Sequence, residues 1–262
     1  MSSTEQQEVI NLLENQGKLL VMLAPSFPVQ FNYPQIAGCL KRLGFEFVVE
    51  VAVGAAETNR QLLELIKKYP TKRFITSPCP TVVQLIKTQY PHLVTNLAVI
   101  DSPMSATAKL MAKRYPEHRL VFIGPCPMKK IEAKNYSELK IIVLTYREIA
   151  EIFKLKQILE TKDDFFANFD EQGQQTRLYP VSGGLAQSSG LNEIMTDEEY
   201  DVVSGPVLVK KVLDEFPKSE KLKVLDVLNC EGGCINGAGI DSPLTLDQRR
   251  LKVVAHWAKS VR

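Results

Sequence analysis

Long apolar runs and concentrated positive charge are both missing from this sequence. No apolar stretch approaches the roughly 18 residues that a membrane-spanning helix needs, and residues 1–7 lack the features of a signal peptide. The formal net charge is only +2, and the basic residues form nothing denser than short pairs such as Lys129-Lys130. We therefore expect a cytoplasmic protein that binds neither nucleic acid nor a membrane.

Cysteine is also scarce, with five residues in the chain. In a reducing compartment such residues are more often thiols or metal ligands than disulfides. Cys39 falls inside a predicted helix and is interpreted as a core residue. The other four end apolar runs beside Pro or Gly, in Ser77-Pro78-Cys79-Pro80, Gly124-Pro125-Cys126-Pro127 and Cys230-Glu231-Gly232-Gly233-Cys234. Four thiolates suit a soft metal centre, either an iron–sulfur cluster or a tetrahedral zinc ion.

The alternation of apolar runs and amphipathic stretches predicts an α/β fold. Strands are predicted at 18–24, 45–53, 73–76, 97–100, 120–123, 140–144, 200–204 and 223–228. Helices are predicted at 5–16, 33–43, 57–68, 82–90, 105–115, 146–155, 207–215 and 245–261. The polar stretch 157–177 has no clear period and is interpreted as an insertion.

A faint internal repeat accompanies this alternation. Residues 67–80 and 113–127 both contain a helix end, a strand and a Pro-Cys-Pro loop. We therefore expect a single domain over 1–262 with two similar lobes, at about 18–116 and 117–240, and a C-terminal helix at 245–261. Each lobe should hold a mostly parallel sheet flanked by helices. Ligands bind outside the carboxyl ends of parallel strands, so the cysteines are expected in the cleft between the lobes.

The cysteine motifs resemble those of the hydrogen-activating domain of iron-only (FeFe) hydrogenases. That family has Thr-Ser-Cys-Cys-Pro, then Met-Pro-Cys followed by Lys and Glu, then two cysteines separated by three residues before Asn-Gly-Gly-Gly. The matching stretches are Thr76-Ser77-Pro78-Cys79-Pro80, Gly124-Pro125-Cys126 with Lys129 and Glu132, and Cys230 to Cys234 with Asn236-Gly237-Ala238-Gly239. The three motifs occur in the family's order, and the resemblance spans roughly residues 18–240.

The resemblance implies a metal centre and a pocket around it. A 4Fe-4S cluster would be held by Cys79, Cys126, Cys230 and Cys234, and Cys234 would bridge to a diiron unit that carries CO and cyanide. Lys129 corresponds to the lysine that hydrogen-bonds a cyanide, although it could also be an ordinary surface lysine. The remaining pocket residues implied by their order are Pro25, Ser26, Ser102, Pro103, Met104, Gly183 and Gly184.

Several departures from the family pattern predict slow catalysis. Pro78 replaces the family's proton-relay cysteine, and Leu62 and Leu65 occupy the positions expected for its acidic proton path. Positioned proton transfer contributes about 10²–10⁴-fold to a rate. No cysteine precedes residue 18, so electrons are expected from an external carrier such as a ferredoxin or a partner subunit.

These features lead to an expected function and two alternatives. The first is an FeFe-hydrogenase-type oxidoreductase of low activity, or a hydrogen sensor, with maturation proteins supplying any diiron site. One alternative is a non-enzymatic 4Fe-4S electron-transfer protein or redox sensor without the diiron site. The other is a zinc-stabilised interaction module, although paired zinc ligands favour a spacing of two residues and three separate Cys230 from Cys234.

Overall fold

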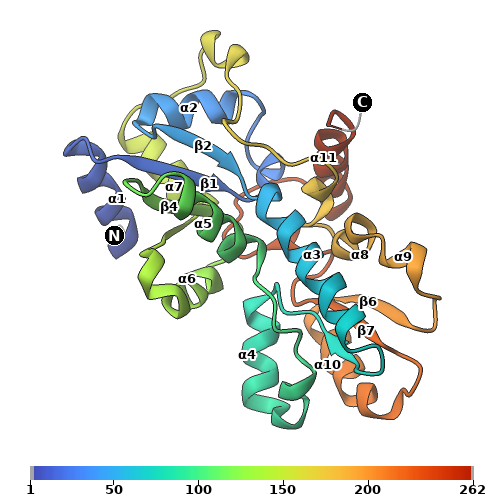
Figure 1. Cartoon of the computed structure of the whole chain (residues 1–262). Helices are drawn as coiled ribbons and strands as arrows, with labels where there is room; N and C mark the ends of the chain where they lie inside the picture. The colour runs from blue at the N-terminus through green and yellow to red at the C-terminus, as the bar shows by residue number, and fades with distance from the viewer. Residues whose placement is uncertain (1–2, 261–262) are drawn as a thin grey trace.

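The protein contains two parallel β-sheets (Figure 1). Its structure is a computed structural model that describes residues 3–260. The first sheet has the order β2-β1-β4-β5 and contains β1 (Leu19–Leu23), β2 (Phe47–Glu50), β4 (Arg119–Gly124) and β5 (Ile142–Thr145). The second has the order β3-β7-β6 and contains β3 (Phe74–Ile75), β6 (Tyr200–Ser204) and β7 (Val224–Leu228). All pairings between these strands are parallel, which confirms the predicted α/β fold.

Eleven α-helices connect and cover the strands within residues 3–260. They are α1 (Thr4–Glu14), α2 (Gln35–Leu43), α3 (Ala52–Lys68), α4 (Pro80–Gln89), α5 (Pro103–Arg114), α6 (Met128–Ala133), α7 (Tyr146–Leu155), α8 (Gly184–Ser189), α9 (Leu191–Ile194), α10 (Pro206–Glu215) and α11 (Leu246–Ala258). Residue 261, the end of the predicted tail helix, lies outside the described residues.

Local sequence sets where many of these helices begin and end. Proline occupies the first position of α4, α5 and α10, where its missing N–H has no helical partner to lose. Gly44 ends α2 with a φ of +118°, a left-handed conformation that glycine adopts readily at a helix C-terminus. The polar stretch 157–177 contains two short 3-10 turns rather than a regular helix.

The division of the chain between the sheets differs from the predicted lobes at 18–116 and 117–240. β3 belongs to the second sheet, while β4 and β5 belong to the first, so the two sheets are interleaved along the chain. The physical reason lies in β1, whose five residues are all buried and apolar, so that both of its edges need a strand partner. β4 fills the edge opposite β2.

The strand predicted at 97–100 is also absent from the described structure. Pro91–Asn96, just before it, forms a 3-10 turn, and within 97–100 an isolated bridge joins Leu97 to Ile75. This segment nevertheless runs along β3 and leads directly into α5.

Each face of the second sheet packs against its own apolar cluster. Leu225 and Val227 of β7 pack with α4 and α10, while Val224 packs with α3, α8 and Tyr179. The two faces follow from the two-residue period of a strand. Helices α3 and α5 pack closely because Gly54 has no side chain, and a Cβ at Gly54 would lie 2.2 Å from Thr107 Oγ1.

Candidate metal centre

The four motif cysteines line a single pocket between the two sheets. Cys79 and Cys230 lie in the loops that follow β3 and β7 of the second sheet. Cys126 follows β4 of the first sheet, and Cys234 begins a 3-10 turn at Cys234–Asn236. The carboxyl ends of both sheets therefore supply thiols to one cavity, although these residues are far apart in the chain.

Two glycines bring the cysteine loops into direct contact. Gly233 has a φ of +102°, and a Cβ there would lie 2.5 Å from the Pro180 carbonyl oxygen. A Cβ at Gly237 would lie 2.4 Å from the Pro125 carbonyl oxygen. Only glycine allows such close approach of two backbones. The loop from Cys230 to Gly237 is thus fixed against the loops that hold Pro125 and Pro180.

The thiols are buried and influence one another. Burial raises the pKa of Cys230 to about 11, and the nearby Cys79 and Cys126 add to the effect. Burial also raises the pKa of Cys234 well above its usual value, and the other three thiols raise it further. Thiolate is the form that binds metal, so metal binding at this site would release protons.

Four thiolates would bring several negative charges close together. The N-termini of two helices lie beside the cysteines and partly offset these charges. α4 begins at Pro80 directly after Cys79, and α6 begins two residues after Cys126. The Met128 and Lys129 amides hydrogen-bond the Cys126 thiolate and oppose the effect of burial, which raises the pKa of that thiol. A helix N-terminus carries a partial positive charge that favours anions within its first turn.

The thiols are not arranged around a single ion. Within the described residues, no group of three or more His, Cys, Asp or Glu side chains is close enough to hold one metal ion. A tetrahedral zinc site requires four ligands to converge on one point, whereas the irons of a cubane lie at separate corners. The four soft donors around one pocket fit a 4Fe-4S cluster.

Lys129 reaches the edge of the pocket from α6 and uses every donor that it has. Its Nζ lies 3.1 Å from the Pro78 carbonyl oxygen, 3.1 Å from Ser102 Oγ and 2.6 Å from Glu132 Oε2. An ammonium group carries three protons, and these three acceptors take them all. Lys129 thereby joins the loop before Cys79 to the start of α5.

Glu132 supplies the charge that keeps this lysine ionised. The two side chains are 12% and 11% exposed. Burial alone lowers the pKa of Lys129, but the adjacent Glu132 carboxylate outweighs it and leaves the pKa above its usual value. A buried pair offsets part of the desolvation cost of each charge when its remaining hydrogen bonds are made.

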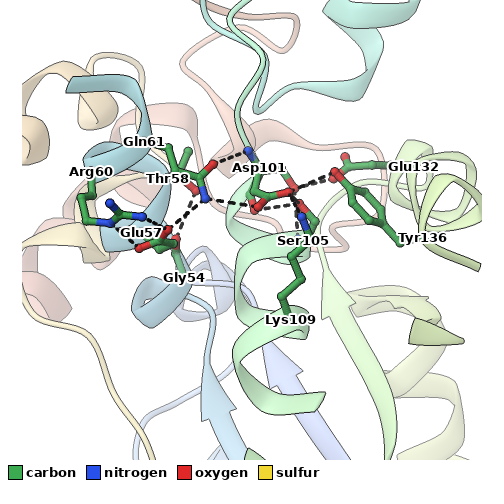
Figure 2. A network of polar contacts seen from close by, with 11 residues as sticks. Gly54, Glu57, Thr58, Arg60, Gln61, Asp101, Ser105, Lys109, Glu132 and Tyr136 are labelled. Atoms are coloured by element: carbon green, nitrogen blue, oxygen red, sulfur yellow. Dashed lines mark hydrogen bonds and ion pairs between the residues drawn. The ribbon is translucent and has the colours of Figure 1, made fainter. Parts of the chain in front are cut away.

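The same polar network continues away from the pocket toward α3, as Figure 2 shows. Ser102 Oγ donates to Glu132, and Ser105 Oγ lies 3.4 Å from Asp101 Oδ1. Asp101 Oδ2 accepts from Gln61 on α3 at 3.2 Å. The start of α5 is thus hydrogen-bonded to both α3 and α6, and this arrangement fixes the Lys129 anchor.

The structure places most of the predicted pocket residues together. Those that line the pocket beside the cysteines are Pro25, Ser26, Pro78, Pro103, Met104 and Lys129. Ser102 contacts the pocket indirectly, through Lys129. Ser26 is fully buried, and its Oγ lies 2.7 Å from the Tyr146 hydroxyl, so it is already hydrogen-bonded.

Gly183 and Gly184 are not among the described residues that line the pocket. They lie at the start of α8, where a Cβ at Gly184 would come within 1.9 Å of the Leu178 carbonyl oxygen. Tyr179 and Pro180 of the same loop line the pocket instead. Sequence analysis missed this pair, although an aromatic residue followed by proline just before the glycines was a usable signal.

A family comparison now identifies the chain. The model described as "Iron only hydrogenase large subunit, C-terminal domain" matches residues 17–238. The chain belongs to this family. Like the resemblance drawn from the cysteine motifs, the match covers most of the chain. Family membership makes this an iron–sulfur protein with a hydrogenase-like fold.

Solved structures of the iron-only hydrogenase family share the fold. A structure of the FeFe-hydrogenase HydA(deltaEFG) superposes with a TM-score of 0.71 at 18% identity, covering 97% of this chain and 88% of that one. A variant of HydA1 from Chlamydomonas reinhardtii gives the same values. At this level of identity the likeness concerns the fold alone.

Two curated relatives are named as iron–sulfur cluster assembly factors rather than as hydrogenases. The probable cytosolic Fe-S cluster assembly factor oxy-4 of Caenorhabditis elegans is 21% identical over 84% of this chain and 60% of its own length. The cytosolic Fe-S cluster assembly factor NAR1 of Yarrowia lipolytica is 27% identical over 53% of this chain and 31% of its own length. This chain thus spans only part of each relative. None of the helices described here is long and apolar enough to cross a membrane.

Proposed function

We propose that this family member is a 4Fe-4S electron-transfer protein that does not convert dihydrogen. Its cluster ligands are Cys79, Cys126, Cys230 and Cys234, which line one pocket. A bound 4Fe-4S cluster supplies one-electron redox chemistry. The chain's own groups fix the thiols, exclude water with apolar side chains and hold a positive charge at Lys129.

The observation that carries this proposal is the complete hydrogen bonding of Lys129. All three ammonium protons have protein acceptors, at 2.6–3.1 Å. A lysine that bound a cyanide ligand of a diiron unit would need to give up one of these three hydrogen bonds, each of which contributes about 0.5–1.5 kcal/mol. The site therefore favours Lys129 as a fixed structural cation.

The pocket lining also departs from the proton path that the family resemblance implies. Pro78 has no exchangeable proton, and Met104 and Phe122 add further apolar surface to the lining. The Ser26 hydroxyl is already paired with Tyr146. Conversion of dihydrogen requires proton transfer, whereas one-electron transfer through a cubane does not. This difference supports the electron-transfer function.

The names of the curated relatives suggest a cellular role. Two are called cytosolic Fe-S cluster assembly factors. We extend the proposal to a cytoplasmic role in iron–sulfur cluster assembly, in which an external electron carrier and partner proteins contact this chain. Hydrogen metabolism is not part of this role.

A second candidate is slow dihydrogen conversion or sensing at an attached diiron unit. The observation that favours it is the apolar surface of Pro25, Pro103 and Met104 in the same pocket as Cys234. Such a site would require maturation proteins and would need Lys129 to release one of its present acceptors.

The test is to purify the full chain without oxygen, after expression with and without hydrogenase maturation proteins. We expect about four iron atoms and four sulfides per chain, the composition of one 4Fe-4S cluster, and an electron paramagnetic resonance signal on reduction. Infrared spectra should contain no CO or cyanide bands in either preparation. Such bands would favour the second candidate, and zinc without sulfide would overturn both.

The cysteines offer a matched control for this experiment. Cys79→Ala should lose the cluster, because it removes one of four ligands. Cys39→Ala should keep it, because Cys39 is buried on α2 beside Asp164 and Arg42 and is not part of the pocket lining. Equal iron content in the two variants would contradict the ligand assignment.

A further inference from the structure

Asp226 is a fully buried carboxyl group without a cationic partner. It lies on β7 and is 4% exposed. Thr76 Oγ1 donates to its Oδ1 at 3.2 Å, and the Ala186 amide also hydrogen-bonds it. Within residues 3–260, no Lys, Arg or His side chain forms an ion pair with it, unlike the buried Glu132, which pairs with Lys129. Nothing in the proposed cluster binding uses this acid.

The position of Asp226 connects it to two of the cysteine loops. β7 ends two residues after Asp226, at Leu228, and Cys230 follows in the next loop; Leu228 and Cys230 both line the pocket. Thr76 directly follows β3 and begins the loop that leads to Cys79. The Thr76 hydroxyl also accepts from the Val227 amide at 3.2 Å. The Asp226–Thr76 hydrogen bond therefore joins β7 to the start of the loop that holds Cys79.

Tyr179 lies close to both the acid and the pocket. Its hydroxyl is buried and has no hydrogen-bond partner among the described residues. Burial raises the pKa of Tyr179 well above its usual value, and the nearby Asp226 and Cys234 add to this effect. Because Tyr179 also lines the pocket, Asp226 is separated from the cysteines by little more than one side chain.

We propose that Asp226 is a proton-binding site coupled to the electron held by the cluster. Asp226 would take up one proton on one-electron reduction of a bound cluster and would release it on oxidation. The step is balanced: one electron comes from the external carrier, one proton comes from water, and no bond of the cluster changes. Asp226 acts through the electric field and is a positioning residue, not a ligand. This inference rests on the proposed function, because it needs a cluster in the pocket.

The physical basis is the charge interaction across a short, poorly solvated distance. Strand residues advance about 3.3 Å each, which puts the carboxyl on the order of 10 Å from the ligands that follow β7. At an effective dielectric constant of about 20, one added charge at this distance changes a proton affinity about tenfold. The carboxyl can respond in the neutral range because burial raises the pKa of Asp226 to about 6.

The elements packed around Asp226 contribute no competing titration. The residue after β3 is Thr76, which hydrogen-bonds Asp226, α8 contributes a backbone amide, and Val202 of β6 lies beside Asp226 in register. On the α3 side, Ala55 and Leu62 pack around Tyr179. Tyr179 stays neutral in this range, since its pKa is raised. The charged pair nearest the pocket, Lys129 with Glu132, lies on α6 rather than on these elements.

The test is the cluster midpoint potential as a function of pH, measured on the full cluster-loaded chain by redox titration with electron paramagnetic resonance detection. We expect the potential to fall as pH rises near 6 and to level off on both sides. A tenfold change in proton affinity corresponds to a total fall of about 59 mV for one electron. Asp226→Asn should give a potential that does not change in this range.

Two further variants separate the proton-binding role from a structural one. Thr76→Val removes the hydrogen bond that stabilises the ionised carboxylate, so it should move the pH transition upward while keeping it. Asp201→Asn is the matched control, because Asp201 is an exposed acid on the adjacent strand β6 and its loss should leave the transition unchanged. If Asp226→Asn fails to load the cluster, the shift in Thr76→Val decides the question.

Each outcome bears on the proposal. A pH-independent potential in the wild-type protein, or a transition that persists in Asp226→Asn, overturns it. A chain that binds no cluster overturns the proposed function and this inference together. The infrared carboxyl band of the metal-free protein then still reports whether a buried acid titrates near pH 6, and Asp226→Asn should remove that band. An intact cluster without coupling overturns only the inference.

Discussion

Arg177 and Glu50 form a buried ion pair at the end of β2 in the first sheet, with Arg177 Nε 2.8 Å from Glu50 Oε2. Glu50 is fully buried at the end of β2, and the Arg177 side chain is 5% exposed. His256 Nε2, on α11, lies 3.1 Å from the other carboxylate oxygen. The C-terminal helix is therefore linked to the end of a strand near the pocket through one carboxylate.

We expect Glu50→Gln to destabilise the protein by about 3–5 kcal/mol, because it leaves the Arg177 guanidinium buried without a counter-charge. Urea unfolding of the metal-free protein followed by circular dichroism measures the change. Glu198→Gln, in the exposed pair with Lys221, should cost less than about 1 kcal/mol. Equal losses in the two variants would contradict the role of the buried pair.

We expect Lys129→Met to reduce cluster retention even in protein expressed without hydrogenase maturation proteins. The substitution removes the link between the Pro78 carbonyl, Ser102 and Glu132, and it leaves a buried carboxylate unpaired. Iron content after gel filtration and the unfolding free energy are the measurements. Lys134→Met removes the same charge from an exposed position at the end of α6 and should retain the cluster. Full iron content in Lys129→Met would show that the anchor is dispensable.

We expect Gly233→Ala to disrupt the third cysteine loop. A Cβ there would lie 2.5 Å from the Pro180 carbonyl oxygen, in addition to the strain of a φ of +102°. Gly190→Ala is the matched control, since Gly190 has a φ of +75° but its Cβ would have no neighbour closer than 3.7 Å. The control should cost only the left-handed backbone strain of about 1–2 kcal/mol. Gly233→Ala should cost more and should also lose iron, as measured by unfolding and by iron assay.

We expect the stability of the metal-free protein to depend on Asp226 in an acid range. Burial raises its folded-state pKa from 3.8 to about 6, so the protonated acid is the form that the fold favours. Its stabilising effect is complete below pH 3.8 and is lost as pH rises to about 6. Relative to Asp226→Asn, the wild type should lose on the order of 2–3 kcal/mol over this range. Urea unfolding at a series of pH values checks the sign, and a wild type that gains stability with pH relative to the variant would contradict it.

Sequence alone predicted the parts of this structure that depend on local pattern. The buried run of β1 and the helix predicted at 33–43 follow from rules that act within one or two turns of chain, whereas the starts of α4 and α5 at Pro80 and Pro103 lie two residues before the predicted helices. The four cysteines could be placed at strand ends, and the carboxyl ends of parallel strands lie at the same edge of a sheet.

The features that the sequence could not predict depend on contacts between distant segments. The pairing of β4 with β1 crosses the predicted lobe boundary and follows from the need to cover both edges of one buried strand. The hydrogen bonds of Lys129 come from acceptors in two other loops. Gly183 and Gly184 were assigned to the pocket from their order in the chain, but their close packing against Leu178 becomes visible only in three dimensions.

Because the two sheets are interleaved along the chain, they are completed in a fixed order as the protein is synthesised. β3 and β6 have no common partner until β7 leaves the ribosome, because β7 is the middle strand of their sheet. Two of the four thiols lie beyond that strand. A nascent chain that ends before β7 lacks both the middle strand of the second sheet and two of the four thiols, so it cannot hold a four-cysteine cluster until Cys234 has left the ribosome.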